Sequence, residues 1–291
     1  MSMSSPDPIS PQAPVPAEAR QIRIVAHSHL FYWWPVWLFG FLFALWTWAE
    51  GNRLAIVPPE AEMVTVGQGK DAQSTIYFKG DGHQDAKITD TVDRPDGTTV
   101  HKFRPRVSSK SWMGPSYVIL LCLVIIITNV PLRGLWSLVA VILIVTGSLF
   151  ISLFNWWDNI FNALYGLHIF INMAGYLVVA TVVFGGWALA TFVFDNRSYI
   201  IFMPGQIRVC EQIGGREKVY DTVGMTVEKH RDDWFRHIFL GFGTGDLTVR
   251  TAGADRHEII MPNVALIGFK IGPIEQLLRE RQTIKVDQNN V

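Results

Sequence analysis

Residues 240–251, LGFGTGDLTVRT, decide how the C-terminal third of the chain is interpreted. Three glycines, Gly241, Gly243 and Gly245, stand close together here, as glycines do in loops that cradle a phosphate. The spacing is not G-x-G-x-x-G, because the third glycine comes one residue early, and no Lys-Ser/Thr pair follows. The stretch also leads into an alternating strand pattern, so it supplies no helix N-terminus for a phosphate. We therefore predict a structural turn that feeds a β-strand and binds no nucleotide.

The segments around this turn alternate polar and apolar residues, which is typical of antiparallel strands with one buried face. The alternating runs are RSYIIFM, QIRVCEQI, EKVYDTV, GMTVEKH, GDLTVRT and HEIIMP, between residues 197 and 262. Beyond them, the apolar residues of 263–281 recur at helical spacing, which predicts a C-terminal helix. Pro273 stands in its middle, so either the helix kinks there or a new helix begins at Pro273.

Strands followed by a C-terminal helix form the plan of a pleckstrin-homology-like (PH-like) domain. The sequence IRVCEQIGGREKVYDTVGMTVEK…FRHIFLGFGTGDLTVRTAGADRHEIIMPNV, within 207–264, resembles the bacterial PH-like domains of membrane proteins. The resemblance rests on the LG-x-G strand entry and on the I-M-P-x-V end of the last strand, and it covers roughly 196–281. It implies a PH-like β-barrel plus helix over 196–284, followed by a tail at 285–291.

Four apolar stretches are candidates for crossing a membrane, which takes about 20 apolar residues for a hydrocarbon core of about 30 Å. They are 30–49, 114–130, 135–154 and 169–194, and none contains Asp, Glu, Lys or Arg. We place the first helix within 29–50 and the other three within 112–195. The expected fold class is thus a multi-pass α-helical membrane protein, with about four transmembrane helices and a C-terminal PH-like β-barrel plus helix.

The short connections predict the topology of these helices. Pro131, Arg133 and Gly134 form a tight turn between the second and third helices, which predicts an antiparallel hairpin. Arg133 favours the cytoplasmic side for this turn, whereas residues 155–168, which lack Lys and Arg, favour the opposite side. Both termini are then cytoplasmic, in a bacterial inner membrane. The basic run at 102–110 disagrees with this orientation, but it belongs to a long loop, where the charge rule weakens.

The remaining features of the sequence are two polar segments and a pair of small residues. Residues 1–28 are expected to be a disordered, Pro-rich tail, since such a composition buries too little surface to become ordered. Residues 51–111 carry strand and turn signals, which predicts a β-rich extracytoplasmic loop. Gly186 and Ala190 stand four residues apart in the last span and would let another helix approach closely.

Charge and residue clusters limit the ligands. The 25 basic residues balance the 25 acidic ones, which argues against a nucleic-acid partner. Lys229, His230, Arg231, Arg236 and His237 stand close in sequence and are the candidate partner-binding patch. Two aspartates within it dilute the charge, so a protein partner or self-association ranks above an acidic lipid. An open barrel edge can also accept a partner strand.

No constellation of catalytic residues or metal ligands emerges from the sequence. The two cysteines, Cys122 and Cys210, form neither a disulfide framework nor a metal knuckle. We therefore expect a non-enzymatic protein without cofactor or metal: a membrane-anchored PH-like scaffold that docks a protein partner or the membrane surface. The alternative is a subunit of a transport or channel assembly regulated by the PH-like domain. The lack of ionisable residues in the spans counts against that alternative.

Overall fold

The chain divides into two compact units. The computed structural model describes residues 21–54, 62–66, 73–77, 89–93, 95, 97, 99–130, 134–210, 217–252 and 257–288, with the backbone alone for 62–93, 99–103 and 280–288. One unit, here the two-sheet unit, comprises Met1–Phe31, Leu132–Ser137 and Leu189–Val291. The other, the helical unit, comprises Tyr32–Pro131 and Leu138–Ala188.

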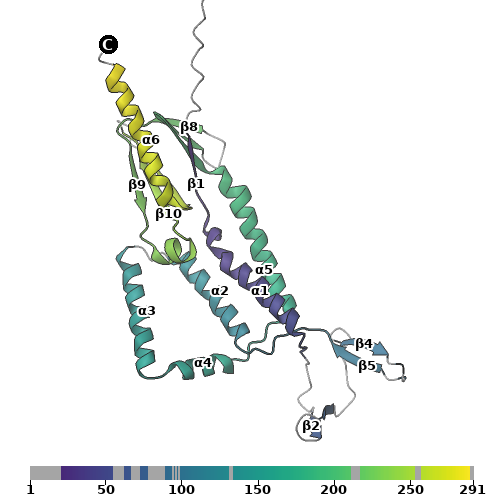
Figure 1. Ribbon diagram of the computed structural model, residues 1–291. Coiled ribbons are helices and arrows are strands. Elements are labelled where there is room, and N and C mark those ends of the chain that lie inside the picture. The colour runs from purple at the N-terminus through teal and green to yellow at the C-terminus, as the bar shows by residue number, and fades with distance from the viewer. Residues whose placement is uncertain are drawn as a thin grey trace, which may run out of the picture. The chain divides into compact units, whose positions relative to one another are not determined.

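The two-sheet unit contains a four-stranded and a three-stranded antiparallel sheet (Figure 1). The first has the order β1-β6-β7-β8, with β1 Ile22–Val25, β6 Tyr199–Met203, β7 Gln206–Cys210 and β8 Glu217–Asp221. The second has the order β11-β10-β9, with β9 Thr226–His230, β10 Gly245–Arg250 and β11 Glu258–Val264. The six later strands follow the alternating runs of the sequence, because the apolar residue of each pair faces the core.

Strand β1 corrects the prediction of a disordered tail over 1–28. Ile22–Val25 pairs antiparallel with β6, in the register Ile22↔Phe202 to Val25↔Tyr199. Ile24 is fully buried, and that burial offsets the entropy of ordering so short a segment. Residues 1–20, which hold all five prolines of that segment, lie outside the described residues.

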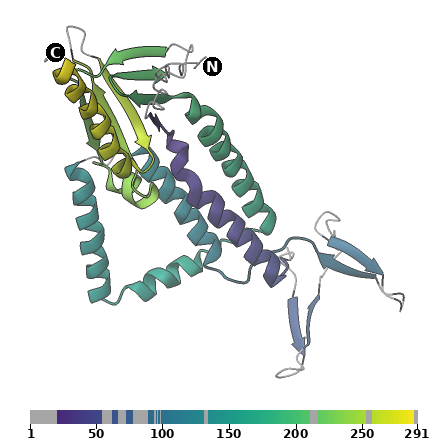
Figure 2. The same ribbon diagram turned by 45° about the horizontal axis from the view of Figure 1, so that its top comes forward.

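Both sheets and the C-terminal helix share one hydrophobic core. Helix α6, Ile267–Gln288, lies against the strands (Figure 2) and buries Ile267, Ile274 and Leu277. These side chains pack with residues of β1, β6, β7, β10 and β11. Of the two alternatives for Pro273, the structure shows one helix that continues through it.

The expected closed barrel is not present among the described strands. Each sheet is antiparallel within itself, but no ladder joins the four-stranded to the three-stranded sheet in the part of the chain that the structure describes. The turn between β8 and β9 contains Gly224, with φ of 70°. This turn carries the chain from one sheet to the other without continuing the ladder.

The helical unit contains α1, α2, α4, α5 and most of α3. Their bounds are α1 Trp34–Glu50, α2 Met113–Asn129, α3 Leu135–Leu153, α4 Trp157–Gly166 and α5 Met173–Ala188. A short helix, η1 His29–Trp33, precedes α1, and η3 Leu189–Phe194 and η4 Asp195–Arg197 follow α5 in the two-sheet unit. Three helical stretches among the described residues are long and apolar enough to cross a membrane, namely His29–Glu50, Leu135–Leu153 and Met173–Arg197. Helix α2 is also apolar but has only 17 residues.

Helices α1, α2 and α5 pack around a close approach at Gly40. A Cβ added to Gly40 would lie 2.7 Å from the Tyr117 Oη on α2 and 2.8 Å from the Ala180 Cβ on α5. The Tyr117 hydroxyl donates to the Val36 carbonyl at 3.2 Å. Tyr176 on α5 meets the Tyr117 ring edge-on, with centroids 5.2 Å apart. A small residue in α1 thus lets three helices meet, as is typical of helix packing in membranes.

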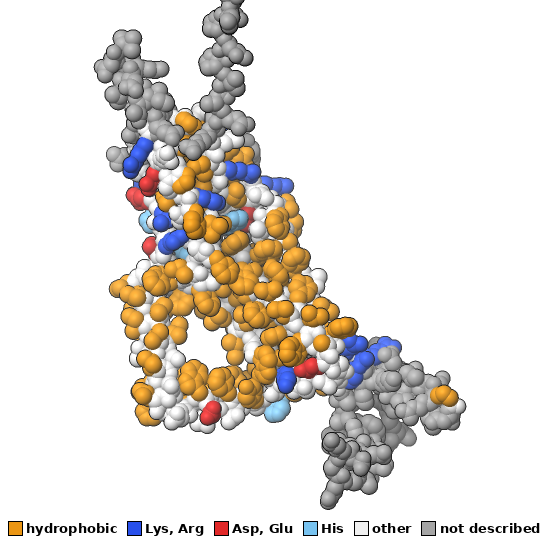
Figure 3. Space-filling view, in the orientation of Figure 1, with side chains coloured by type: hydrophobic (Ala, Val, Ile, Leu, Met, Phe, Trp, Pro, Cys, Tyr) orange, Lys and Arg blue, Asp and Glu red, His pale blue; other side chains and the backbone are white. Residues whose placement is uncertain are grey.

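Helix α3 does not form the predicted antiparallel hairpin with α2. The two helices do not pack along each other, and the part of α3 beyond Ser137 lies apart from α1, α2 and α5 (Figures 1 and 2). Leu143 is 65% exposed and Leu153 is 78% exposed. Hydrophobic side chains cover the visible face of the helical unit (Figure 3). A short connection in the sequence therefore does not decide whether two uniformly apolar helices pair, because apolar composition alone specifies no partner helix.

Residues 51–111 contain two separate β-hairpins. The first pairs β2 Glu62–Val66 with β3 Gln73–Tyr77, and the second pairs β4 Thr89–Asp93 with β5 Thr99–Phe103. Gly97, in the connection between β4 and β5, has φ of 81°. A left-handed backbone of this kind favours glycine. This part of the loop has the β-rich character that its sequence predicts.

Candidate functional site

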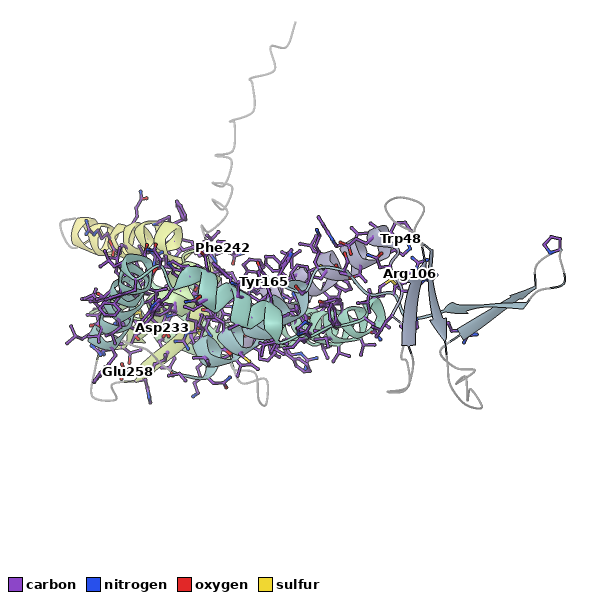
Figure 4. The ribbon with its side chains drawn as sticks, turned by 90° about the horizontal axis from the view of Figure 1, so that it is seen from below. Trp48, Arg106, Tyr165, Asp233, Phe242 and Glu258 are labelled. Atoms are coloured by element: carbon purple, nitrogen blue, oxygen red, sulfur yellow. The ribbon has the colours of Figure 1, made fainter. Side chains whose placement is uncertain are left out.

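A groove in the two-sheet unit runs beside the outer edge of β11. Its volume is about 570 Å³. Strand β11 lines it with residues 258–262. The rest of the lining comes from the segment before α1, from the end of the last helical stretch and from β7: Ala26, His27, Ser28, Leu30, Ala190, Phe194, Asp195, Ser198, Val209 and Cys210. Figure 4 labels Glu258, the first residue of β11. The groove lies where a barrel ladder between the two sheets would otherwise close, because β11 pairs with β10 on its other edge.

The wall of the groove contains a contact between a histidine and an aspartate. The His27 Nδ1 lies 3.2 Å from the Asp195 Oδ2, and the Asp195 side chain is only 5% exposed. The His27 backbone N–H donates to the Pro262 carbonyl at 3.2 Å, and the Asn263 side-chain amide donates to the His27 carbonyl at 2.9 Å. A buried carboxylate needs such a partner, since desolvation without one is costly. These contacts fix the segment before η1 against the end of β11.

Two further groups, one polar and one apolar, affect what the groove can bind. The Ser28 Oγ is buried and has no hydrogen-bond partner among the described residues. Ile260, in the middle of β11, is 61% exposed. The groove thus offers an unpaired edge strand, an apolar side chain and a hydroxyl without a partner, which are the elements that an extended peptide uses when it adds to a sheet.

Arg236 and His237 do not belong to an exposed basic patch, contrary to the sequence-based expectation. They are 4% and 1% exposed, on the helical turn η5 Phe235–Leu240. The Arg236 Nε lies 3.7 Å from the Asp233 Oδ2, and its Nη2 lies 4.0 Å from the Asp246 Oδ2. The His237 Nε2 lies 3.8 Å from the Asp246 Oδ1. We call these four side chains the buried polar cluster, and Asp233 is labelled in Figure 4.

Two further residues, Thr244 and Asn263, contact the cluster, and Asn263 connects it with the groove. The His237 Nδ1 lies 3.2 Å from the Thr244 hydroxyl, which is fully buried. The Asp246 Oδ1 accepts a hydrogen bond from the backbone N–H of Asn263 at 2.9 Å. Because Asn263 also binds His27, a chain of polar contacts connects η5 with the groove wall. Sequence reasoning missed Asp195, Asp246 and Asn263, since no local pattern joins positions this far apart.

The other three residues of the expected patch are dispersed. Lys229 is exposed on β9, while the His230 Nε2 faces Glu228 at 3.6 Å and its Nδ1 faces Asp232 at 4.0 Å. Arg231 donates to the Gly243 carbonyl at 3.0 Å. The acidic neighbours and internal contacts take up most of the positive charge, so the five residues form no single basic surface.

The glycines of 240–251 form the passage from η5 into β10. Gly241 follows η5, and Gly243 has φ of 93°, in the left-handed region. Gly245 begins β10, and a Cβ there would lie 2.9 Å from the His230 carbonyl oxygen and 2.9 Å from the Ile267 side chain. The first two positions serve the turn, whereas Gly245 permits a close approach of backbone.

Gly186 and Ala190, the two predicted helix-packing residues, differ from each other in their surroundings. A Cβ added to Gly186 would meet no heavy atom within 4 Å. Ala190 is 6% exposed and lines the groove. Close packing occurs instead at Gly40, and at Gly114, where an added Cβ would overlap the Ile169 carbonyl.

Metal ligands do not converge in the part of the chain that the structure describes, where no group of three His, Cys, Asp or Glu side chains could hold an ion. Cys122 and Cys210 are both free thiols. No family model matches the chain, and no curated protein or solved structure matches it significantly.

Proposed function

We propose that this protein is a membrane-anchored binding module whose two-sheet unit docks an extended segment of a protein partner. The PH-like resemblance of residues 196–281 supports a binding domain, although the sheets leave a groove where a barrel would close. The observation that carries the proposal is this groove of about 570 Å³ beside the unpaired edge of β11. A strand added there would satisfy backbone groups of β11 that have no ladder partner among the described strands.

Chain connectivity supports four membrane crossings. Strand β1 precedes α1, Gly134 precedes α3, and β6 follows η4, and all three belong to the two-sheet unit. The chain must therefore leave this unit and return to it twice, once through α1 and α2 and once through α3 and α5. If α1 crosses the membrane, then α2 crosses back, and its 17 residues are about the minimum for a span. Both termini then lie on one side, which we propose is the cytoplasmic side of a bacterial inner membrane.

The position of the groove beside a candidate span restricts the kind of partner that could bind there. Ala190 and Phe194 line it, and both belong to the candidate span Met173–Arg197. A segment bound there would lie close to the membrane surface. We therefore infer that the partner is itself a membrane protein and that it supplies the polar segment flanking one of its spans.

A cross-linking experiment with matched variants tests this function. The photoreactive amino acid benzoylphenylalanine replaces Ile260 in the full chain in native membranes, and the cross-linked residues are mapped by mass spectrometry. We expect one short segment next to a span of one partner. Ser198→Trp, which fills the groove, should abolish the cross-link, whereas Val219→Trp, at an exposed position of β8, should leave it intact. A cross-link that survives Ser198→Trp, or none at all, would refute docking in this groove.

A further inference from the structure

The segment around η5 buries its ionisable side chains and exposes its apolar ones, which is the reverse of the usual arrangement at a protein surface in water. Its ionisable residues Arg236 and His237 are 4% and 1% exposed, and Asp233 is 2% exposed. Its large apolar residues are outside: Trp234 is 51%, Ile238 49%, Phe239 65% and Phe242 67% exposed. We call these four residues the η5 surface; Phe242 is labelled in Figure 4. Water favours the opposite arrangement, so a surface of this kind indicates a non-aqueous neighbour.

The buried polar cluster explains why the segment holds this orientation. Arg236 faces Asp233 at 3.7 Å and Asp246 at 4.0 Å, and His237 faces Asp246 at 3.8 Å. The carboxylates fix the polar side of η5 against β10, and the apolar side then faces outward. The backbone also contributes, because the Gly243 N–H donates to the His237 carbonyl at 2.8 Å and shapes the turn that carries Phe242.

A second contact places this surface at the start of a candidate span. The Asp232 carbonyl accepts a hydrogen bond from the Gly134 N–H at 3.0 Å and another from the Ser137 hydroxyl at 3.2 Å. These donors flank the first turn of α3, in which Leu135 and Trp136 are 74% and 73% exposed. The chain two residues before Trp234 is thus held at the residues where Leu135–Leu153 would enter a membrane.

We propose that the η5 surface inserts into the headgroup region of the bilayer that α3 spans, and so holds the two-sheet unit against the membrane. The proposal rests on the proposed function only in that α3 must be a span. Trp and Phe favour the membrane–water interface. The segment's Arg and His are turned inward, so insertion relies on apolar contact and does not need an anionic lipid. The surface should therefore bind neutral phosphatidylcholine.

Depth-dependent quenching tests the insertion directly. Single cysteines replace Phe239 or Phe242 in a Cys122→Ser, Cys210→Ser background of the full chain, and each is labelled with bimane. The protein is reconstituted into phosphatidylcholine vesicles with a nitroxide quencher near the headgroup. Val219→Cys, at a 56% exposed apolar position of β8 in the same unit, is the matched control. Leu143→Cys on α3, with a quencher deep in the acyl chains, reports whether α3 spans the membrane.

The outcomes distinguish a failure of the η5 insertion from a failure of the proposal that α3 spans the membrane. We expect loss of fluorescence at 239 and 242 with the shallow quencher, at 143 with the deep one, and none at 219. Quenching at 143 with no quenching at 239 and 242 would overturn the insertion and leave the spans in place. The η5 surface would then have to contact protein, either a second copy or the partner. No quenching at 143 would refute the spanning helix, and with it the premise of the insertion.

Discussion

At the scale of single residues, Arg236 and His237 face inward because Asp233 and Asp246 are placed to receive them. The contacts of Arg236 with the two carboxylates, at 3.7 and 4.0 Å, are ion pairs rather than short hydrogen bonds. The Asp233 Oδ2 and the Arg236 Nε have no hydrogen-bond partner among the described residues. Buried pairs of this kind contribute little net stability when intact, but the loss of one partner is costly because a charge remains buried.

Replacing Arg236 should therefore destabilise the two-sheet unit strongly. We expect Arg236→Met to lower the free energy of unfolding by about 3 kcal/mol, because it removes the charged partner of the buried Asp233 side chain. The thermal unfolding midpoint of the full chain in detergent measures this. Arg208→Met is the matched control, since its pair with Glu217 at 3.5 Å is about half exposed, and it should cost less than about 1 kcal/mol. Equal midpoints for the two variants would contradict a buried cluster.

The sequence indicates the residue types of this site but not their directions. Basic residues at 229–237 are visible in the sequence, and we interpreted them as a surface. Their burial depends on Asp246 and Asn263, which reach the same place from β10 and β11. Tertiary contacts between positions this far apart leave no local pattern. The groove was likewise unpredictable, except for the expectation of an open strand edge.

At the scale of elements, alternation predicts strands well, and the antiparallel strands from β6 to β11 are confirmed. Strand β1 was missed because four residues after a Pro-rich segment give too short a pattern to recognise. The hairpin of α2 and α3 was wrong, since apolar composition does not specify which helices pair. Hydropathy predicts which segments form the apolar helices, and small residues such as Gly40 determine where these helices meet.

Strand β1 should matter to stability as much as a central strand. Ile24 is fully buried in the shared core, so Ile24→Ala should cost about 2–4 kcal/mol through lost contacts and a cavity. Ile260→Ala, at a 61% exposed position on β11, should change stability by no more than about 0.5 kcal/mol. The same thermal measurement applies. If Ile24→Ala behaves like Ile260→Ala, then β1 is not part of the folded unit.

The close approach at Gly40 gives a test for the helical unit. Gly40→Val would place atoms where the Tyr117 hydroxyl and the Ala180 methyl already lie, so we expect a loss of about 1–3 kcal/mol. Gly147→Val on α3 is the control, because a Cβ there meets no heavy atom within 4 Å. Both variants make the same change within a helix, so the difference in unfolding midpoint isolates packing. Equal midpoints would mean that α1, α2 and α5 do not pack as described.

At the scale of the whole molecule, the ladder between β1 and β6 joins the chain ahead of the first helix to the chain after the last. The register from Ile22↔Phe202 to Val25↔Tyr199 brings segments about 175 residues apart into one sheet. Gly134, between α2 and α3, belongs to the same unit through its bond to Asp232. The chain therefore leaves this unit and returns to it twice, and in the topology that we propose the unit that carries the groove lies on one side of the membrane.

Labelling with a membrane-impermeant maleimide on sealed vesicles of known orientation tests this central claim most directly. Single cysteines at Val219 in β8, at Gly97 between β4 and β5, and at Asp158 in α4 replace the native residues in a chain without Cys122 and Cys210. We expect 97 and 158 to be labelled from one side and 219 only from the other. Labelling of all three from the same side would contradict the paired crossings and the placement of the binding unit that follows from them.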